Sequence, residues 1–210
     1  MRRRTLLRAG ATAGLVAVTG CTAGFTEPRF DGGFEDGLGD WETAAHIGPE
    51  EPLEEFDWTI DVSDERAATG TRSLRVRNEG DHDDGTCWAS HRVPVEPGEA
   101  YTASVTATFW SESESFNTLR NAVMRLGAEP PEAEADFPDP GQNTTDLGVT
   151  PYGGLREPLH LAEGWREYRF EWTTPELTTD RLHVSVGTTV VWETEMTHFV
   201  DDVTVELAPR

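Results

Sequence analysis

The sequence contains no lysine. Its 17 basic residues are all arginine and stand against 39 aspartates and glutamates, which gives a formal net charge of −22 at pH 7. A surface with this excess of acid repels nucleic-acid phosphates and anionic lipid headgroups. The composition therefore excludes nucleic acid as a partner.

Cysteine is also scarce, with only Cys21 and Cys87. Cys87 begins the apolar stretch Cys87-Trp88-Ala89. The nearest basic residue in the sequence that could activate its thiol is His91, which directly precedes Arg92. We interpret Cys87 as a small buried thiol rather than a reactive one. If Cys21 is acylated, no intrachain disulfide can form.

No apolar run is long enough to span a bilayer, and the longest candidate lies at the N-terminus. Arg2–Arg8 has a twin-arginine pattern, Ala9–Gly20 is short and weakly apolar, and Val18-Thr19-Gly20-Cys21 has the form of a lipobox. These features predict a Tat signal peptide over residues 1–20 and a lipidated Cys21, with a short tether over 21–28. An uncleaved N-terminal anchor is the alternative.

The charge and the leader predict the same setting. The leader removes four arginines and no acid, so the mature chain holds 13 arginines against 39 acids, a net charge of −26. Acidic excess without lysine resembles haloarchaeal proteins, in which high salt screens the repulsion. We therefore expect an exported protein anchored to the outer face of the cell membrane. The seven tryptophans argue against a disordered acidic tail.

Helical periodicity is missing throughout, and short alternating runs recur instead between Gly, Pro, Asp and Asn clusters. About ten strands without crossover helices predict an all-β, two-sheet antiparallel sandwich of jelly-roll type over residues 29–208. The expected strands are Arg29–Glu35, Trp41–His46, Phe56–Val62, Ser73–Asn78, Thr86–Val95, Ala100–Trp110, Thr118–Leu126, Arg166–Thr173, Arg181–Val191 and Thr197–Leu207.

One segment, residues 127–164, breaks this pattern with six prolines amid acids and glycines. A connection of this length is uncommon in a compact domain and is usually functional or disordered. We predict either a plain surface insertion or a contribution to a ligand rim, with Tyr152 as the aromatic candidate. Asn143-Thr144-Thr145 in the same segment is a glycosylation sequon.

The last expected strand carries an unusual acid. If side chains alternate, Phe199, Asp201, Val203 and Val205 share one face, which is apolar except for Asp201. A carboxylate in a core is costly unless a cation or a set of hydrogen-bond donors meets it. Asp201 is therefore predicted either to bind a metal ion or to accept hydrogen bonds from backbone donors.

Several short motifs occur in the order found in one family. The chain resembles carbohydrate-binding modules of the galactose-binding-like jelly-roll group. The motifs that carry this resemblance are Asp31-Gly32-Gly33-Phe34-Glu35-Asp36-Gly37 with Trp41, Gly70–Val76, Val95–Tyr101, Gly164–Tyr168 and Val200–Val205.

The resemblance implies a structural calcium ion that joins the first and last strands. Glu35 and Asp201 would be side-chain ligands, and Gly33 would supply a carbonyl oxygen. Calcium takes six to eight hard oxygen ligands, which suits these groups.

Sugar-binding proteins stack an aromatic ring on the apolar face of a pyranose. Trp110 and Trp88 are the candidates because each is expected on the wet face of a strand, with Arg125 and Asn121 as polar partners. For each tryptophan the alternative, which the sequence favours, is ordinary packing at a sheet edge or under the long loop. His183 and His198, on late strands, are expected at the surface.

Motifs of catalysis are missing: the sequence has no Gly-x-Ser-x-Gly elbow, no HExxH and no phosphate loop. We therefore expect a non-catalytic lipoprotein that binds a glycan or cell-surface polymer. The alternatives are an adhesion domain that contacts another envelope protein without a sugar site, and a small hydrolase with converging carboxylates.

Overall fold

The computed structural model describes residues 29–48, 53–79, 85–112, 119–147, 150–161, 163–191 and 195–210. The predicted signal peptide, Cys21 and the whole of the predicted tether lie outside the described residues. Within them, regular structure consists of eleven strands and three short 3-10 turns. None of the helical turns there is long and apolar enough to cross a membrane.

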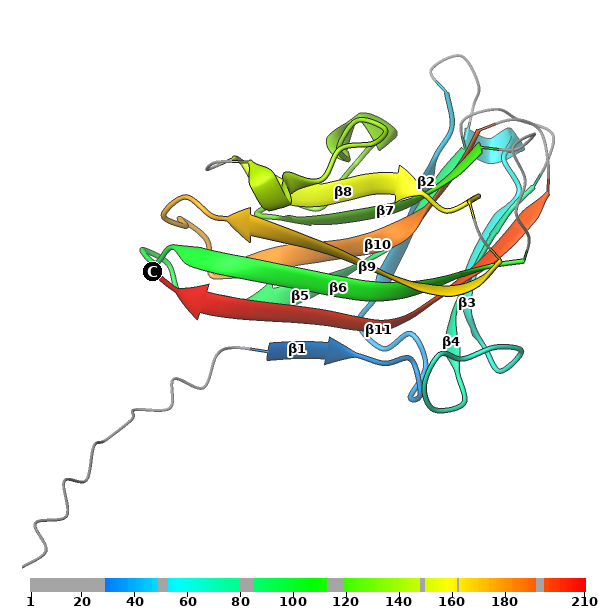
Figure 1. Cartoon of the computed structure of the whole chain (residues 1–210), viewed down its shortest axis with the longest axis horizontal. Helices are drawn as coiled ribbons and strands as arrows, with labels where there is room; N and C mark the ends of the chain where they lie inside the picture. The colour runs from blue at the N-terminus through cyan, green and yellow to red at the C-terminus, as the bar shows by residue number, and fades with distance from the viewer. Residues whose placement is uncertain are drawn as a thin grey trace, which may run out of the picture.

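The strands form two antiparallel sheets that pack face to face (Figure 1), which confirms the predicted sandwich. Sheet A has the order β3-β4-β11-β6-β9, with β1 also paired to β11, and sheet B has the order β2-β5-β10-β7-β8. The strands of sheet A are β1 (Arg29–Gly32), β3 (Trp58–Ser63), β4 (Ser73–Asn78), β6 (Tyr101–Ser111), β9 (Gly164–Thr173) and β11 (Met196–Pro209). The strands of sheet B are β2 (Glu42–His46), β5 (Gly85–Pro94), β7 (Leu119–Gly127), β8 (Tyr152–Pro158) and β10 (Arg181–Val191).

The long segment 127–164 contains regular structure that the sequence did not predict. It holds strand β8, which pairs with β7 at the edge of sheet B, and the turns η2 (Glu134–Asp136) and η3 (Thr144–Asp146). Two glycines obscure β8 in the sequence. Each is required by close packing, because a Cβ on Gly153 would lie 2.2 Å from the Cβ of Trp172 and one on Gly154 would lie 2.4 Å from the carbonyl oxygen of Met124.

The core lies between the sheets and follows the predicted alternation. The inward face of β6 is buried throughout, and its inward partners on β9 and β11 are buried as well. Cys87 is part of this core, and burial raises the pKa of its thiol far above the usual value. The inert thiol predicted at Cys87 therefore fits its surroundings.

Strand β11 departs from simple alternation. Asp201 pairs with Thr108 on β6, but the next pair is Thr204 with Thr106, so one extra residue of β11 bulges out. Asp202 adopts a φ of 50° at this bulge. The extra residue reverses the two faces of the strand. The prediction that Phe199, Asp201, Val203 and Val205 share one face is therefore wrong.

The bulge also marks where β11 changes its neighbour. Before it, residues 196–200 pair with β4, and after it, residues 203–206 pair with β1. Figure 1 shows the blue strand β1 running alongside the red strand β11. The two ends of the domain thus lie side by side, as the resemblance implied.

His198 was expected at the surface but is fully buried, because the bulge leaves it on the inward face with Val200. Among the described residues, neither of its ring nitrogens has a hydrogen-bond partner. Burial, together with the nearby Arg120 guanidinium, lowers its pKa to about 3. His198 is therefore a neutral core residue near neutral pH.

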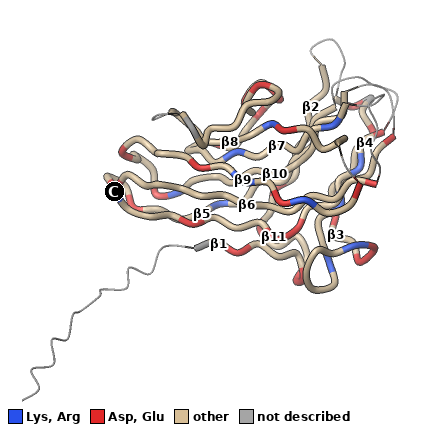
Figure 2. The backbone as a smooth tube through the Cα atoms, in the orientation of Figure 1, with Lys and Arg blue, Asp and Glu red and all other residues tan. Residues whose placement is uncertain are grey.

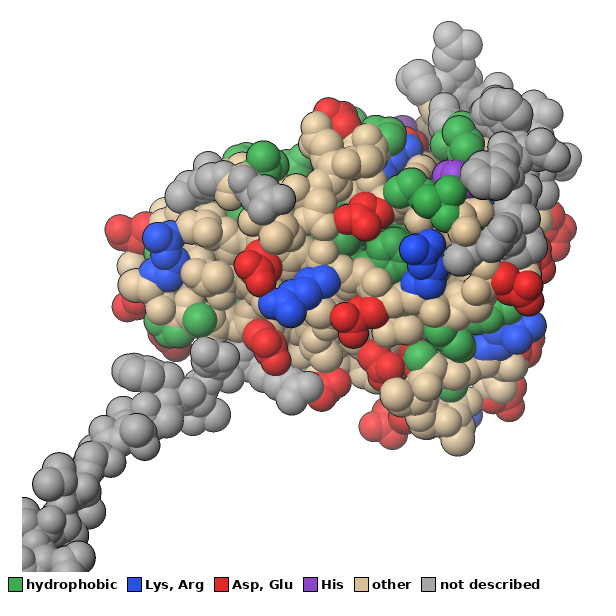
Figure 3. All heavy atoms as spheres, in the orientation of Figure 1, with side chains coloured by type: hydrophobic (Ala, Val, Ile, Leu, Met, Phe, Trp, Pro, Cys, Tyr) green, Lys and Arg blue, Asp and Glu red, His purple; other side chains and the backbone are tan. Residues whose placement is uncertain are grey.

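Charge is spread widely over the domain. Figure 2 shows acidic positions along strands and turns of both sheets, with arginines placed among them. On the face in Figure 3, acidic and arginine side chains alternate rather than forming a patch of one sign.

Candidate functional site

The outward face of sheet A carries a row of side chains that crosses five strands. Successive strand pairings place Asp61, Arg75, Phe199, Trp110 and Trp165 opposite one another. Phe199 joins this row only because the bulge turns it away from the core. Its ring meets Trp110 edge-on, with the ring centroids 5.6 Å apart.

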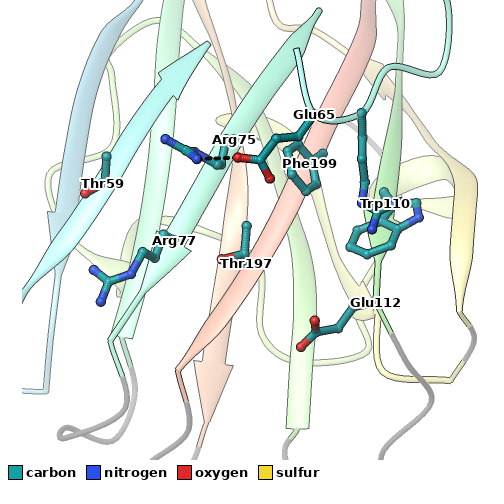
Figure 4. Close-up of a pocket in the computed structure, with 9 residues that line it drawn as sticks. Thr59, Glu65, Arg75, Arg77, Trp110, Glu112, Thr197 and Phe199 are labelled. Carbon is teal, nitrogen blue, oxygen red and sulfur yellow. Dashed lines mark hydrogen bonds and ion pairs between the residues drawn. The ribbon is translucent and has the colours of Figure 1, made fainter. Parts of the chain in front are cut away.

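A cavity of about 260 Å³ opens on this face, and we refer to it as the arginine pocket. Figure 4 shows the side chains that surround it, which come from β3, β4, β6 and β11 and from the loop between β3 and β4. Its lining residues are Thr59, Glu65, Arg66, Arg75, Arg77, Trp110, Glu112, Thr197 and Phe199.

The guanidinium groups in the pocket are held in defined positions. Arg75 binds both carboxylate oxygens of Asp61, at 2.8 and 2.6 Å, and donates to Glu65 at 2.8 Å. Arg77 bridges Asp57 at 3.1 Å and Glu195 at 3.3 Å. The hydrogen bond to Asp61 raises the pKa of Arg75, and the one to Glu195 raises that of Arg77.

Arg66 occupies a different position, with its guanidinium stacked on the Trp110 ring 3.8 Å from the centroid. Among the described residues, no carboxylate forms an ion pair with Arg66. Trp110 is 9% exposed, so its indole forms part of the pocket floor and not an open platform. A sugar ring would stack on Trp110 only if Arg66 moved aside.

The loop 64–72 that carries Glu65 and Arg66 is fixed by the two acids predicted to bind calcium. Asp201 accepts hydrogen bonds from the backbone N–H groups of Ala68, Thr69 and Asp202, at 2.8, 3.2 and 2.9 Å. Glu35 accepts from the backbone N–H groups of Thr71 and Arg72, both at 2.8 Å. The turn after β1 and the last strand therefore hold the same loop.

This geometry bears on both predictions for Asp201. The side chain accepts backbone donors, as the metal-free alternative required. Asp201 is 1% exposed and burial raises its pKa, while among the described residues no arginine forms an ion pair with it. A divalent cation would offset that charge, although backbone N–H groups already meet both oxygens of the carboxylate. Since no group of three or more acidic, His or Cys side chains gathers within the described residues, the remaining oxygens would come from the backbone and water.

Gly33 is exposed and lies directly after β1, in the turn that leads to Glu35. A Cβ at this position would meet nothing within 4 Å. The space beside its Cα is therefore empty. Within the described residues, no contact orients the carbonyl oxygen of Gly33 toward a metal site.

The outward face of sheet B differs, because part of segment 127–164 covers it. Trp88 is 1% exposed and meets Phe137 edge-on, with the ring centroids 5.5 Å apart. Glu134 secures this cover through Arg156 at 2.6 Å and the Thr86 hydroxyl at 3.0 Å. The expectation that Trp88 offers a face to a ligand is therefore wrong.

Arg125 and Tyr152 also lie on sheet B, away from Trp110 on sheet A. The Arg125 guanidinium stacks 4.7 Å from the centre of the Tyr152 ring and donates to the carbonyl oxygen of Glu129. Arg125 is 9% exposed and Asn121 is 8% exposed. Tyr152 is partly exposed and lines a small cavity of about 190 Å³ beside Pro138 and Leu147. The predicted ligand residues are thus divided between the two sheets.

The sequon asparagine is engaged in the fold. The Asn143 side-chain nitrogen donates to the Glu157 carboxylate at 2.7 Å and to the carbonyl oxygen of Arg169 at 3.0 Å. Its side-chain oxygen accepts from Thr145. Attachment of a glycan to this nitrogen after folding would break both donated bonds.

Sequence reasoning missed most of the arginine pocket. Phe199 was assigned to the core, and the loop that brings Arg66 onto Trp110 has no strand pattern. A signal was available in Asp201-Asp202, since two acids in a central strand favour a local irregularity over regular pairing.

No protein-family model and no curated protein matches the sequence. Among solved structures, the chain is similar to a family 61 carbohydrate-binding module in complex with β-1,4-galactotriose, at 13% identity and a TM-score of 0.49, covering 85% of this chain and 94% of that one. It is similar to a family 4 module at 15% identity and a TM-score of 0.49, covering 85% and 97%. A family 11 module from Clostridium thermocellum, in complex with a β-1,3-1,4-mixed-linked tetrasaccharide, has 10% identity and a TM-score of 0.46, covering 84% and 94%.

These solved structures are carbohydrate-binding modules with a sandwich fold. The fold of this chain is established by its own strand pairing. At the identities and TM-scores given above, the similarity carries no argument about what the chain binds.

Proposed function

We propose that this domain binds a neutral glycan, without catalysis, in the arginine pocket. The observation that carries the proposal is the combination of an aromatic floor with ion-paired guanidinium groups around it. Once Arg66 moves off the indole, Trp110 supplies apolar surface for the C–H face of a sugar ring, and the buried Phe199 ring holds the indole edge-on. Arg75 and Arg77, paired with acids, present donors beside acceptors, which is what hydroxyl groups require.

The charge balance supports a neutral ligand. The three arginines of the pocket stand against Glu65 and Glu112 in the lining, Asp61 behind Arg75, and Asp57 and Glu195 beside Arg77. An anionic group would compete with carboxylates that already hold the guanidinium groups. A neutral sugar needs only to share their remaining donors and acceptors.

The test is a glycan array probed in molar NaCl with the full chain carrying Cys21→Ser, followed by calorimetry on the glycan that binds. Trp110→Ala and Arg75→Gln should each weaken binding at least about tenfold, because they remove the floor and a fixed donor. Thr197→Phe fills the cavity from a partly exposed position and should do the same. Arg169→Gln, an exposed arginine of sheet A outside the pocket, is the matched control.

Unchanged affinity in all three pocket variants would contradict the proposed site. A chain that binds no glycan on the array but captures an envelope protein would favour the adhesion alternative instead.

We also propose that calcium stabilises the loop 64–72, with carboxylate oxygens of Glu35 and Asp201 and the carbonyl oxygen of Gly33 among its ligands. Supporting this are the buried charge of Asp201 and the meeting of both acids on one loop. Addition of millimolar Ca²⁺ after chelation should raise the thermal midpoint of the wild-type chain, and Asp201→Asn should abolish this rise. Equal midpoints with Ca²⁺ and with chelator would refute it.

We propose, from the N-terminal sequence, that the chain is exported by the twin-arginine route and anchored through a lipid on Cys21. Cys21→Ser should then release the protein from the membrane fraction into the medium. Retention of this variant with the membranes would point to the uncleaved anchor.

A further inference from the structure

A second cavity, of about 410 Å³, lies at the edge of sheet B. It is lined by Gly39, Asp40, Trp41, Glu42, His91 and Arg92, so the turn before β2, the start of β2 and the C-terminal part of β5 form it together. We call it the Trp41 cavity. It shares no residue with the arginine pocket. Its volume falls in the lower part of the range of roughly 300–1,000 Å³ that is usual for small-molecule sites.

Trp41 is partly exposed and held from behind by other aromatic rings. The centroid of its ring lies 5.4 Å from that of Phe34, 5.3 Å from that of His91 and 5.8 Å from that of Phe30. Phe30 in turn stacks on His91 at 4.5 Å. An indole fixed in this way loses little conformational freedom when a ligand stacks on it.

The backbone also fixes the position of this indole. The N–H of Trp41 donates to the carbonyl oxygen of Leu38 at 3.0 Å, and Gly39 between them has a φ of 52°. This left-handed turn favours glycine. Asp40 and Trp41, which follow the turn, are therefore presented together at the rim.

The polar rim suits hydroxyl groups. Arg92 donates to the Glu42 carboxylate at 2.9 Å, so this pair offers donors and acceptors side by side, and the exposed Asp40 adds a further acceptor. His91 adds no positive charge at neutral pH, because burial lowers its pKa. The three charged groups leave one net negative charge, which disfavours an anionic ligand.

We infer that the Trp41 cavity is a second, separate binding site for a neutral pyranose, which makes the domain bivalent for glycans. The inference shares its ligand class with the proposed function and rests on it only in that respect. Two sites on one domain would hold a polymer by avidity, because release from one leaves the other bound. A polymer with repeated sugars could also be cross-linked.

The test uses the full chain with Cys21→Ser in molar NaCl and the methyl glycosides of glucose, galactose, mannose and xylose as probes. The indole N–H signals of the seven tryptophans are followed by two-dimensional NMR, with Trp41 and Trp110 assigned from Trp41→Phe and Trp110→Phe. At least one glycoside at millimolar concentration should shift the Trp41 signal. Arg92→Gln should weaken that shift several-fold, while Thr197→Phe leaves it unchanged.

Four outcomes separate the two sites. A Trp41 shift that persists when Thr197→Phe has removed binding at Trp110 supports the inference. A Trp41 shift with no response at Trp110 supports the site at Trp41, but it overturns bivalence and counts against the arginine pocket. A Trp110 shift with a silent Trp41 at tens of millimolar glycoside overturns the inference and leaves the proposed function standing. A Trp41 shift produced by tetramethylammonium but by no glycoside overturns it in favour of a cation site.

Bivalence has its own measurement. With a polysaccharide recognised on the array, the wild-type chain should form a precipitate, and Trp41→Ala or Thr197→Phe should each prevent it. Precipitation that is unchanged by Trp41→Ala would overturn bivalence. Circular dichroism confirms that each variant keeps its strands.

Discussion

The outward faces of the two sheets contain similar side chains, but only one of them is open. Sheet A presents Trp110 with arginines around a cavity, and sheet B presents Trp88 near Arg125 and Arg156 beneath a cover. The difference comes from the loops. On sheet A, loop 64–72 covers Trp110 only with the Arg66 guanidinium and leaves a cavity beside it, whereas on sheet B the segment with Phe137 lies over the tryptophan.

The largest effect is expected where the cover meets sheet B. Trp88→Ala should lower the free energy of unfolding by about 3–5 kcal/mol, because it opens a cavity beneath Phe137. Urea denaturation measures this loss. Glycan binding in the arginine pocket should be unchanged once the variant is folded. A loss below about 1 kcal/mol would mean that the cover is only loosely packed.

The next effect concerns the inward neighbour of Phe199 on sheet A. Burial keeps His198 neutral, with a pKa of about 3 against its usual 6.5, so the unfolded chain binds a proton that the folded chain does not. Stability should therefore fall as the pH drops below 6.5, by about 3 kcal/mol by pH 4 from this residue alone. His198→Leu should remove this part of the decline. Parallel denaturation curves of the two proteins over that range would contradict it.

A smaller effect is expected at the loop that borders the open face. Asp201→Asn replaces the charged acceptor of two loop amides and should cost about 1–3 kcal/mol in chelator. It should also weaken glycan binding in the arginine pocket, because Arg66 and Glu65 lose their fixed position. Glu206→Gln, an exposed acid on the same strand, is the control and should change neither measurement.

The smallest effect is expected from Glu35→Gln. Hydrogen bonds from Thr71 and Arg72 lower the pKa of this exposed carboxylate. Its contribution to stability is therefore present above the usual pKa of 4.5 and is lost as the pH falls through the lowered value. The difference between the urea midpoints of the variant and the wild-type chain should be largest at pH 7 and shrink as the pH falls below 4.5. A constant difference would show that the carboxylate charge has no role.

Strand periodicity was sufficient to predict the sandwich. The strands Ser73–Asn78 and Arg181–Val191 have the bounds expected from the sequence, and the buried face of β6 is the one that alternation gave. Strand β8 was not predicted, because Gly153 and Gly154 contribute no side-chain pattern, although close packing requires both glycines.

The candidate site was far less predictable. Alternation assumes regular pairing, so it cannot place Phe199 or His198 on a strand with a bulge. Burial of Trp88 depends on Phe137, which is 49 residues away in the sequence. Trp41 entered the prediction only as part of a fold motif, because the aromatic rings that hold it come from separate strands and turns.

The bulge in β11 divides one strand between two tasks. After the bulge, residues 203–206 pair with β1 and so join the beginning of the domain to sheet A. Before the bulge, residues 196–200 pair with β4, and two of them line the arginine pocket. Substitutions before the bulge would therefore change which ligand the pocket accepts, while the pairing with β1, which depends on the residues after the bulge, would stay the same. Loss of the single extra residue would remove that independence, because any change of ligand preference would then also change the core.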